Sequence, residues 1–294
     1  MINLIKYLLI ILLLNGIFAQ GNFQILNIPP STRLLSLSNS GHAANNASNS
    51  HNAASIKTDY RNINFQSHFY PANIIYIKSE LVLPMESNIY SLEYSNLNYG
   101  KFKDAESNYS FNVSEFLLKG SIKTEILDKI SIGGGLGYSV NKISNQFAHA
   151  LFISLGARTQ IFNPLFGVGI SINNFGIITK NFYDKKEELP EAVILSTFYQ
   201  PIYFPGVLYC DIYKEKSMDD VQIRLGLEST IYKNIILRFG YNSNIMYLAD
   251  SHSSYLKGLS GGIGVIAEKW DVDIGFYNLE TAGIISSISL TYKQ

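Results

Sequence analysis

Residues 221–242 read VQIRLGLESTIYKNIILRFGYN, and this stretch decides the fold class. From Val221 to Leu227 every second residue is apolar, and the residues between them are polar, small or charged. Successive side chains of a β-strand point to opposite faces, so this spacing gives one strand an apolar face and a polar face. Lys233 interrupts the pattern before it resumes, which predicts a tight hairpin between two such strands.

The same alternation recurs from residue 62 to the end of the chain. It predicts about fourteen strands of about ten residues, the length that a tilted strand needs to cross a bilayer. The predicted strands are 62–69, 73–83, 87–97, 111–123, 130–143, 147–161, 165–175, 191–200, 204–213, 221–232, 234–243, 257–267, 270–278 and 284–292.

The predicted connections between these strands alternate between short and long. The long ones are 98–110, 176–190, 214–220 and 244–256. Outer-membrane barrels have tight periplasmic turns and extended outer loops, whereas a soluble β-sandwich has no reason to sort its loops in this way. We therefore expect an all-β fold, a transmembrane antiparallel β-barrel over residues 62–294. An even number of strands would place both termini on the periplasmic side.

The composition agrees with a chain that is partly covered by lipid. Of 294 residues 47% are apolar and 16% are charged, and 23 Lys and Arg balance 23 Asp and Glu. An average soluble domain has roughly 25% charged residues. The balance excludes a polybasic nucleic-acid binder, so we expect outer-membrane lipid and no nucleic acid among the partners.

Residues 1–19 have the features of a secretory signal peptide. Lys6 precedes the apolar run Leu8–Phe18, and Ala19 provides a small residue for cleavage. The alternative is an uncleaved anchor, but the run is shorter than the roughly 20 residues that a membrane-spanning helix needs. Export together with membrane-spanning strands predicts the outer membrane of a bacterium.

Ionisable residues on the polar strand faces are expected to line the interior of the barrel. There they would pair across the lumen and hold it together instead of performing chemistry. The expected lumenal charges are Arg158, Arg224, Glu228, Arg238, Asp271 and Asp273.

Residues 20–61 precede the barrel and do not alternate. They are rich in Ala, Ser and Asn, and the segment is too long for a simple connector. One interpretation is a disordered leader. The other is a plug, or hatch, folded into the mouth of the barrel.

This segment resembles the N-terminal motif of the PorV/PorQ family of outer-membrane proteins, relatives of the FadL-type fatty-acid channels. The resemblance rests on Ile25–Ile28, on Ser31-Thr32-Arg33 and on Asn52-Ala53-Ala54, with Ser38-Asn39 where the family has Gly-Gly and Ala53 where it has Pro. The residues that carry the plug motif are Leu26, Ser31, Arg33, Leu37, Gly41 and Asn52.

A second element supports the resemblance. Tyr99, Gly100 and Phe102 resemble the family's Tyr-Gly-x-Phe element, which we place in the long loop 98–110. The resemblance implies a barrel of 14 strands with an N-terminal hatch, and service in type IX protein secretion.

Patterns typical of catalysis are missing from the sequence. There is no G-x-S-x-G, Walker, H-E-x-x-H or paired-cysteine motif, so we expect no enzyme and no cofactor or metal.

Three hypotheses follow for the role of the chain. The first is a platform whose extracellular loops dock secreted cargo proteins or surface-exposed secretion partners, since binding residues concentrate on loops. The second is a FadL-like channel for hydrophobic small molecules gated by the plug, which requires an apolar pocket between plug and wall. The third is a soluble secreted β-sandwich or propeller.

Overall fold

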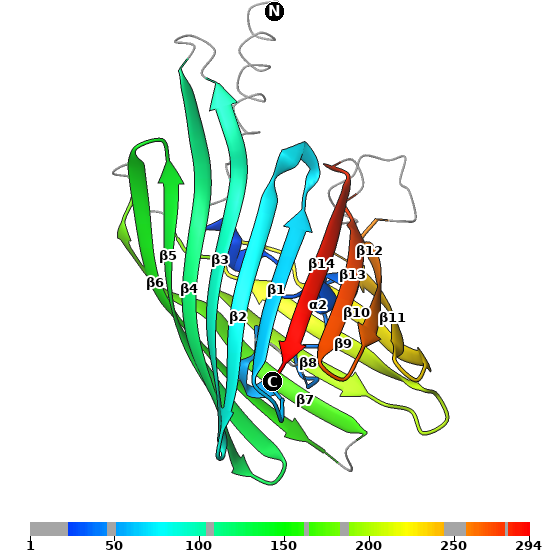
Figure 1. Cartoon of the computed structure of the whole chain (residues 1–294). Helices are drawn as coiled ribbons and strands as arrows, with labels where there is room; N and C mark the ends of the chain where they lie inside the picture. Colours follow the sequence, from blue (N-terminus) through cyan, green and yellow to red (C-terminus); the bar gives the residue numbers. More distant parts are fainter. Residues whose placement is uncertain are drawn as a thin grey trace, which may run out of the picture.

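A computed structural model describes residues 23–45, 51–103, 109–161, 165–182, 188–243, 257–279 and 282–294. The predicted signal peptide, residues 1–19, lies outside these ranges. The chain forms one closed antiparallel barrel of fourteen strands in which each strand pairs with its neighbours in sequence (Figure 1). The barrel closes where β1 pairs with β14, from Asn62 opposite Lys293 to Phe69 opposite Ser286. The predicted fold class is confirmed, and a sandwich or propeller is excluded.

The elements have the following bounds. The strands are β1 (Asn62–Phe69), β2 (Ile75–Met85), β3 (Asn88–Lys103), β4 (Ser110–Leu127), β5 (Ile130–Ile143), β6 (Gln146–Gln160), β7 (Phe166–Lys180), β8 (Ala192–Tyr199), β9 (Gly206–Glu215), β10 (Gln222–Tyr232), β11 (Ile235–Asn242), β12 (Leu259–Ile266), β13 (Trp270–Asn278) and β14 (Ile284–Lys293). The helices are η1 (Gln24–Asn27), α2 (Thr32–Ser36), η2 (Ala53–Ser55) and η3 (Pro71–Asn73). Among the described residues no helix is long and apolar enough to cross a membrane.

The barrel is apolar outside and polar inside. On β2 the outward side chains include exposed Ile75 and Ile77, while Lys78 and Glu80 point inward and are buried. A soluble domain has the opposite distribution, with its apolar side chains in the core and its charges in water. The outer surface is therefore of the kind that faces lipid, and closure pairs the backbone groups that no water could satisfy there.

The two ends of the barrel differ in their connections. At the rim where β1 begins and β14 ends, the C-terminal rim, Glu86-Ser87 join β2 to β3 and Lys233-Asn234 join β10 to β11. At the opposite rim residues 181–191 separate β7 from β8. The β5–β6 connection, Ser144-Asn145, is a short turn at that same rim.

Three of the predicted loops begin too early. Residues 98–103 continue β3 and residues 176–180 continue β7, so the β3–β4 hairpin is the tallest feature of the opposite rim in Figure 1. Residues 214 and 215 likewise belong to β9. The predicted loop 244–256 lies outside the described residues.

A bulge interrupts the alternation near the end of β3. Asn98 is opposite Ser114 and Gly100 is opposite Val113, so Tyr99 is an extra residue, and Gly100 has a φ of 86°. The bulge shifts the alternation by one residue, and the outward side chains of Asn96 and Asn98 are already polar. In β7 the register also shifts, near Asn174, which has a φ of 60°.

Candidate functional site

The N-terminal segment, described at residues 23–45 and 51–61, crosses the inside of the barrel from one rim to the other. Phe23 packs in a buried cluster with Tyr70 and Tyr99 near the opposite rim. Ile56 packs against Val82 and Ile89 near the C-terminal rim. Between them α2 contacts strands β11 to β14 and β1, and η2 contacts β4 to β6.

Local sequence explains the fold of α2. The Ser31 hydroxyl caps the helix by accepting a hydrogen bond from the backbone N–H of Leu34. The helix ends in a turn where Ser38 and Asn39 have φ values of 52° and 59°. These two residues stand where the family that the segment resembles has Gly-Gly, and Asn tolerates this left-handed conformation better than most residues. Gly41 has a φ of 91°.

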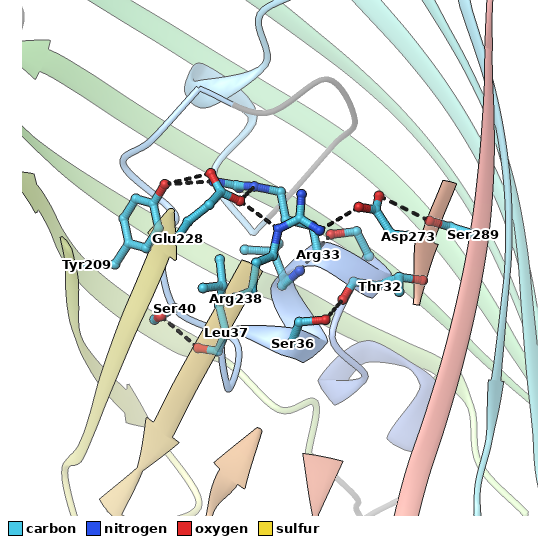
Figure 2. A network of polar contacts seen from close by, with 12 residues as sticks. Thr32, Arg33, Ser36, Leu37, Ser40, Tyr209, Glu228, Arg238, Asp273 and Ser289 are labelled. Carbon is cyan, nitrogen blue, oxygen red and sulfur yellow. Dashed lines mark hydrogen bonds and ion pairs between the residues drawn. The ribbon is translucent and has the colours of Figure 1, made fainter. Parts of the chain in front are cut away.

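Arg33 on α2 is bound into a network of side chains from the wall (Figure 2). Its Nε and Nη2 donate to the two carboxylate oxygens of Glu228 at 2.8 and 3.0 Å, and Nη2 also donates to the Tyr209 hydroxyl at 2.9 Å. Arg238 Nε donates to the same Glu228 at 2.6 Å, and its Nη1 donates to Asp273 at 2.5 Å. Arg33 of the segment is thus inserted into an Arg–Glu–Asp array of the barrel wall. Its two parallel hydrogen bonds to the Glu228 carboxylate are the bidentate geometry that guanidinium and carboxylate groups favour.

The charges of this network favour the ionised guanidinium. Burial works against the charge of Arg33, but Glu228 and Tyr209 outweigh burial, so the pKa of Arg33 is raised. Removing one partner of a buried ion pair leaves an uncompensated charge, so the array favours a docked segment.

Hydroxyl contacts and close backbone packing fix the rest of α2. Thr32 Oγ1 lies 2.7 Å from Ser287 Oγ, and Ser38 Oγ lies 2.8 Å from Ser260 Oγ. At Gly240 an added Cβ would lie 2.2 Å from the backbone carbon of Leu37. Glycine at this interior position is required by the close approach of the segment.

The second half of the segment is packed just as closely. An added Cβ at Gly133 would lie 2.5 Å from the backbone of Ala53 and Ala54. The Asn52 side chain accepts a hydrogen bond from Ala54 N and donates one to the carbonyl of Ala157. Asn52 therefore stabilises both its own turn and the contact with β6.

Arg158 and Arg224, two of the expected lumenal charges, donate hydrogen bonds to the backbone of the segment and do not pair with a carboxylate across the barrel among the described residues. Arg158 Nε donates to the carbonyl of Ala43 at 2.5 Å, and Arg224 Nη1 donates to that of Asn39 at 3.4 Å. Within the described ranges neither arginine forms an ion pair. The loop 39–44 carries the carbonyls of Asn39 and Ala43 into the lumen, and the two guanidiniums donate hydrogen bonds to them. Asp271 pairs with Lys293 at 2.7 Å near the C-terminal rim.

A buried histidine lies in the same loop. The backbone N–H of His42 donates to Asp211 Oδ2 at 3.1 Å, and its ring lies 5.0 Å from that of His51. Burial, and then Arg224, lower the pKa of His42 to about 3. His51, whose pKa is lowered by burial and by His42, is also neutral at pH 7.

A buried lysine also binds the segment and joins it to β2 and β3. Lys78 Nζ donates to the carbonyl of Pro30 at 2.8 Å and lies 3.1 and 3.3 Å from the carboxylates of Glu80 and Glu93. These three residues are not among the expected lumenal charges. The alternation of strand 73–83 was the available signal, because Lys78 and Glu80 have the same parity as the buried Tyr76 and Val82.

Towards the opposite rim the interior becomes apolar. This apolar compartment is formed by residues of the segment and of strands β2, β3, β4 and β6, together with Leu189: Phe23, Ile25, Leu26, Ile28, Tyr76, Leu97, Leu117, Ala148, Ala150, Phe152 and Leu189. A cavity of about 30 Å³ lies beside it, with Lys119, Glu93 and His51 among its polar lining. An apolar cavity of about 150 Å³ holds benzene, so this one is too small for such a solute.

The Tyr-Gly-x-Phe element contributes at the edge of this compartment. The Tyr99 hydroxyl donates to Glu115 Oε1 at 2.7 Å, and Ile25 N donates to Glu115 Oε2 at 3.0 Å. Phe102 stacks on Phe111 across the β3–β4 hairpin, with ring centroids 5.9 Å apart. The element therefore belongs to a strand and not to a loop, and Tyr99, which has the parity of the inward Leu97, points into the barrel.

The plug-motif residues Leu26, Ser31, Arg33, Leu37, Gly41 and Asn52 all lie inside the barrel in this arrangement. The structure joins Arg33, Glu228, Arg238 and Asp273 in one network and keeps Arg158, Arg224 and Asp271 apart from it. Among the described residues, no group of His, Cys, Asp and Glu is arranged to hold a metal ion.

Comparison with known proteins gives similarity in structure alone. No protein-family model and no curated protein matches the sequence. The Pseudomonas putida toluene transporter TodX has a TM-score of 0.65 at 8% identity, over 90% of this chain and 99% of that one. The Ralstonia pickettii toluene transporter TbuX has a TM-score of 0.61 at 10% identity, over 94% and 100%. A Pseudomonas aeruginosa FadL homologue has a TM-score of 0.59 at 11% identity, over 90% and 98%. The barrel is thus FadL-like in fold.

Proposed function

We propose that the protein is a non-enzymatic outer-membrane channel for hydrophobic small molecules, with the N-terminal segment as its plug. The observation that carries the proposal is the apolar compartment, which lies inside an otherwise polar barrel and ends on the segment. The segment covers this apolar interior surface in the structure, and a hydrophobic solute is an occupant that could take the place of the segment's apolar side chains. The structural neighbours named as toluene transporters support this function over protein secretion.

In this proposal the structure is the closed state. The cavity of about 30 Å³ beside the compartment is too small for a solute, so residues 23–28 must move for one to bind. These residues are held by apolar contacts and by the hydrogen bond from Ile25 N to Glu115. Residues 31–44 are held by ion pairs and by close packing on glycines, so they would remain in place.

We further propose that the C-terminal rim, where the barrel strands begin and end, faces the periplasm. Its short turns, such as Glu86-Ser87, are typical of that side of an outer-membrane barrel. The opposite rim, with the tall β3–β4 hairpin, would then face the outside and receive the solute.

The test is uptake of radiolabelled toluene by intact cells of an outer-membrane bacterium that lacks its own hydrocarbon channels. Ala150→Trp fills the apolar compartment and should reduce uptake to the level of cells without the protein. Leu151→Trp is the matched control, because the next side chain faces lipid and uptake should not change. Phe152→Ala enlarges the compartment and should raise uptake. Equal uptake by the wild type and the three variants would contradict the channel hypothesis. So would a wild type that takes up no more toluene than cells without the protein.

A second candidate function is docking of secreted cargo or surface partners in type IX secretion. The observation that favours it is the β3–β4 hairpin, which rises above the opposite rim and carries the stacked pair Phe102 and Phe111. Deleting the gene should then leave secreted cargo in the periplasm, and replacing both rings by Ser should do the same. Normal secretion in both strains, together with solute uptake, would leave the channel as the function.

A further inference from the structure

A basic and aromatic patch lies on the outer face of the barrel, next to the opposite rim. We define it as Tyr138 and Lys142 of β5, Phe147 and His149 of β6, and Lys180 of β7. Lys142 is opposite Phe147, and His149 is opposite Lys180, so their side chains share one face. That face is the lipid-facing one, because it also carries the exposed Leu136 and Leu151.

The aromatic members of the patch form a contiguous surface. The Tyr138 hydroxyl lies 2.7 Å from His149 Nδ1, and the two rings are stacked with centroids 5.9 Å apart. Phe147 stacks on His149 at 6.3 Å, and Lys142 Nζ lies 5.6 Å from the Phe147 ring centroid. Rings at the edge of an apolar band are typical of the level where lipid headgroups begin.

The two lysines lack carboxylate partners within the part of the chain that the structure describes. Other lysines near the rims are paired: Lys216 with Glu188 and Glu191, and Lys293 with Asp271. Lys142 and Lys180 are two strands and two residues apart, which is roughly 12 Å, so their long side chains can reach a single anion between them.

Directly below the patch the outer surface is apolar. Leu151 is opposite Ile177, and Ile153 is opposite Phe175, and all four side chains are exposed. A ligand that covers both zones must be an amphiphile with an anionic head and hydrocarbon chains. A soluble anion would cover only the lysines and leave this apolar surface to other lipids.

We propose that this patch binds the phosphomonoester headgroup of a lipid in the leaflet around the opposite rim. Lys142 and Lys180 hold the phosphate, the hydrogen-bonded pair Tyr138 and His149 supplies one further donor at its edge, and the acyl chains lie on Leu151, Ile153, Phe175 and Ile177. The site is independent of solute transport, since it lies on the outside of the wall.

The experiment measures lipid retention by native mass spectrometry. The full-length mature protein is purified in detergent micelles doped with dimyristoyl phosphatidic acid, which has a phosphomonoester, or with dimyristoyl phosphatidylcholine. The test variant is Lys142→Gln with Lys180→Gln. The control is Lys233→Gln with Lys269→Gln, which removes the same charge from exposed turns at the C-terminal rim. Heat-dependent gel migration verifies that each variant is folded.

The wild type and the control should retain phosphatidic acid in preference to phosphatidylcholine. The test variant should bind phosphatidic acid about 5- to 30-fold more weakly, because each lysine near a lipid headgroup contributes about a fivefold factor. Equal retention by the test variant, or a wild type without preference between the lipids, would overturn the proposal. So would displacement of the retained lipid by excess inorganic phosphate, which would indicate a site for the soluble anion.

Discussion

Arg33 of the N-terminal segment and Glu228 of β10 form a bidentate ion pair inside the barrel, with N–O distances of 2.8 and 3.0 Å. The two residues are 195 positions apart in sequence. Because Glu228 also binds Arg238, the pair couples docking of the segment to the charge array of the wall. Four predictions follow from this and from the neighbouring contacts.

Arg33→Met should loosen the segment and lower the temperature at which the folded barrel unfolds on a heated gel. The expected loss of stability is about 1–3 kcal/mol, which is below the full cost of breaking a buried ion pair. Glu228 keeps its second partner, Arg238, and the side chains of Arg33 and Glu228 are each 16% exposed. Lys216→Met removes an exposed ion pair and should leave the unfolding temperature nearly unchanged. Equal shifts for both variants would contradict the role of Arg33.

Gly240→Ala should displace residues 36–40, because its Cβ would lie 2.2 Å from the backbone of Leu37. Overpacking of this kind costs about 1–3 kcal/mol. Hydrogen–deuterium exchange of residues 31–45 should become faster. In Gly261→Ala the added Cβ would lie an ordinary 3.6 Å from Arg238 O, so exchange should match the wild type. If Gly240→Ala exchanges no faster than Gly261→Ala, the close approach is not present.

Acid should weaken docking of the segment. The pKa of His42 is lowered by burial to about 3, whereas an undocked histidine titrates near 6.5. The undocked state therefore binds more protons between these values, and stability is lost as the pH falls from about 6.5 towards 3, by up to about 1.4 kcal/mol per pH unit for each histidine. After division by the intrinsic exchange rate, which is itself slower at lower pH, the protection of residues 31–45 should fall from pH 7 to pH 5. A His42→Asn, His51→Asn variant should lose less protection, and an equal loss would exclude the histidines as its cause.

Glu115→Ala should release the first turn of the segment. The substitution removes the acceptor of Ile25 N and of the Tyr99 hydroxyl. If residues 23–28 close the channel, toluene uptake by intact cells should rise severalfold. Glu125→Ala is the control, since that carboxylate is 55% exposed and pairs with Lys123 near the C-terminal rim. Uptake that stays at the wild-type rate in both variants would argue against gating by these residues.

The sequence was sufficient to predict the barrel because each strand repeats a local period of two. It failed where that period is broken: the bulge at Tyr99 and the irregularity near Asn174 hid the ends of β3 and β7. Both are single-residue shifts, and outward polar side chains such as Asn98 made the strand resemble a loop.

The site was predictable only in part, for a different reason. The alternation of apolar and polar residues along the strands predicts that Glu228, Arg238 and Asp273 face the interior. The same alternation in strand 73–83 predicts an interior position for Lys78 and Glu80. Which charge meets which depends on contacts between distant elements, and no local pattern records that Arg33 binds Glu228 or that Arg158 binds a carbonyl of the segment.

The most direct measurement is disulfide cross-linking of the segment to the wall, in a Cys210→Ser background. Ser38→Cys with Ser260→Cys and Thr32→Cys with Ser287→Cys replace hydroxyl pairs that are 2.8 and 2.7 Å apart. Both pairs should cross-link in intact cells, and the exchanged pairs Ser38→Cys with Ser287→Cys and Thr32→Cys with Ser260→Cys should not. Equal yields for matched and exchanged pairs, or no cross-link in either matched pair, would show that the segment is not docked inside the barrel.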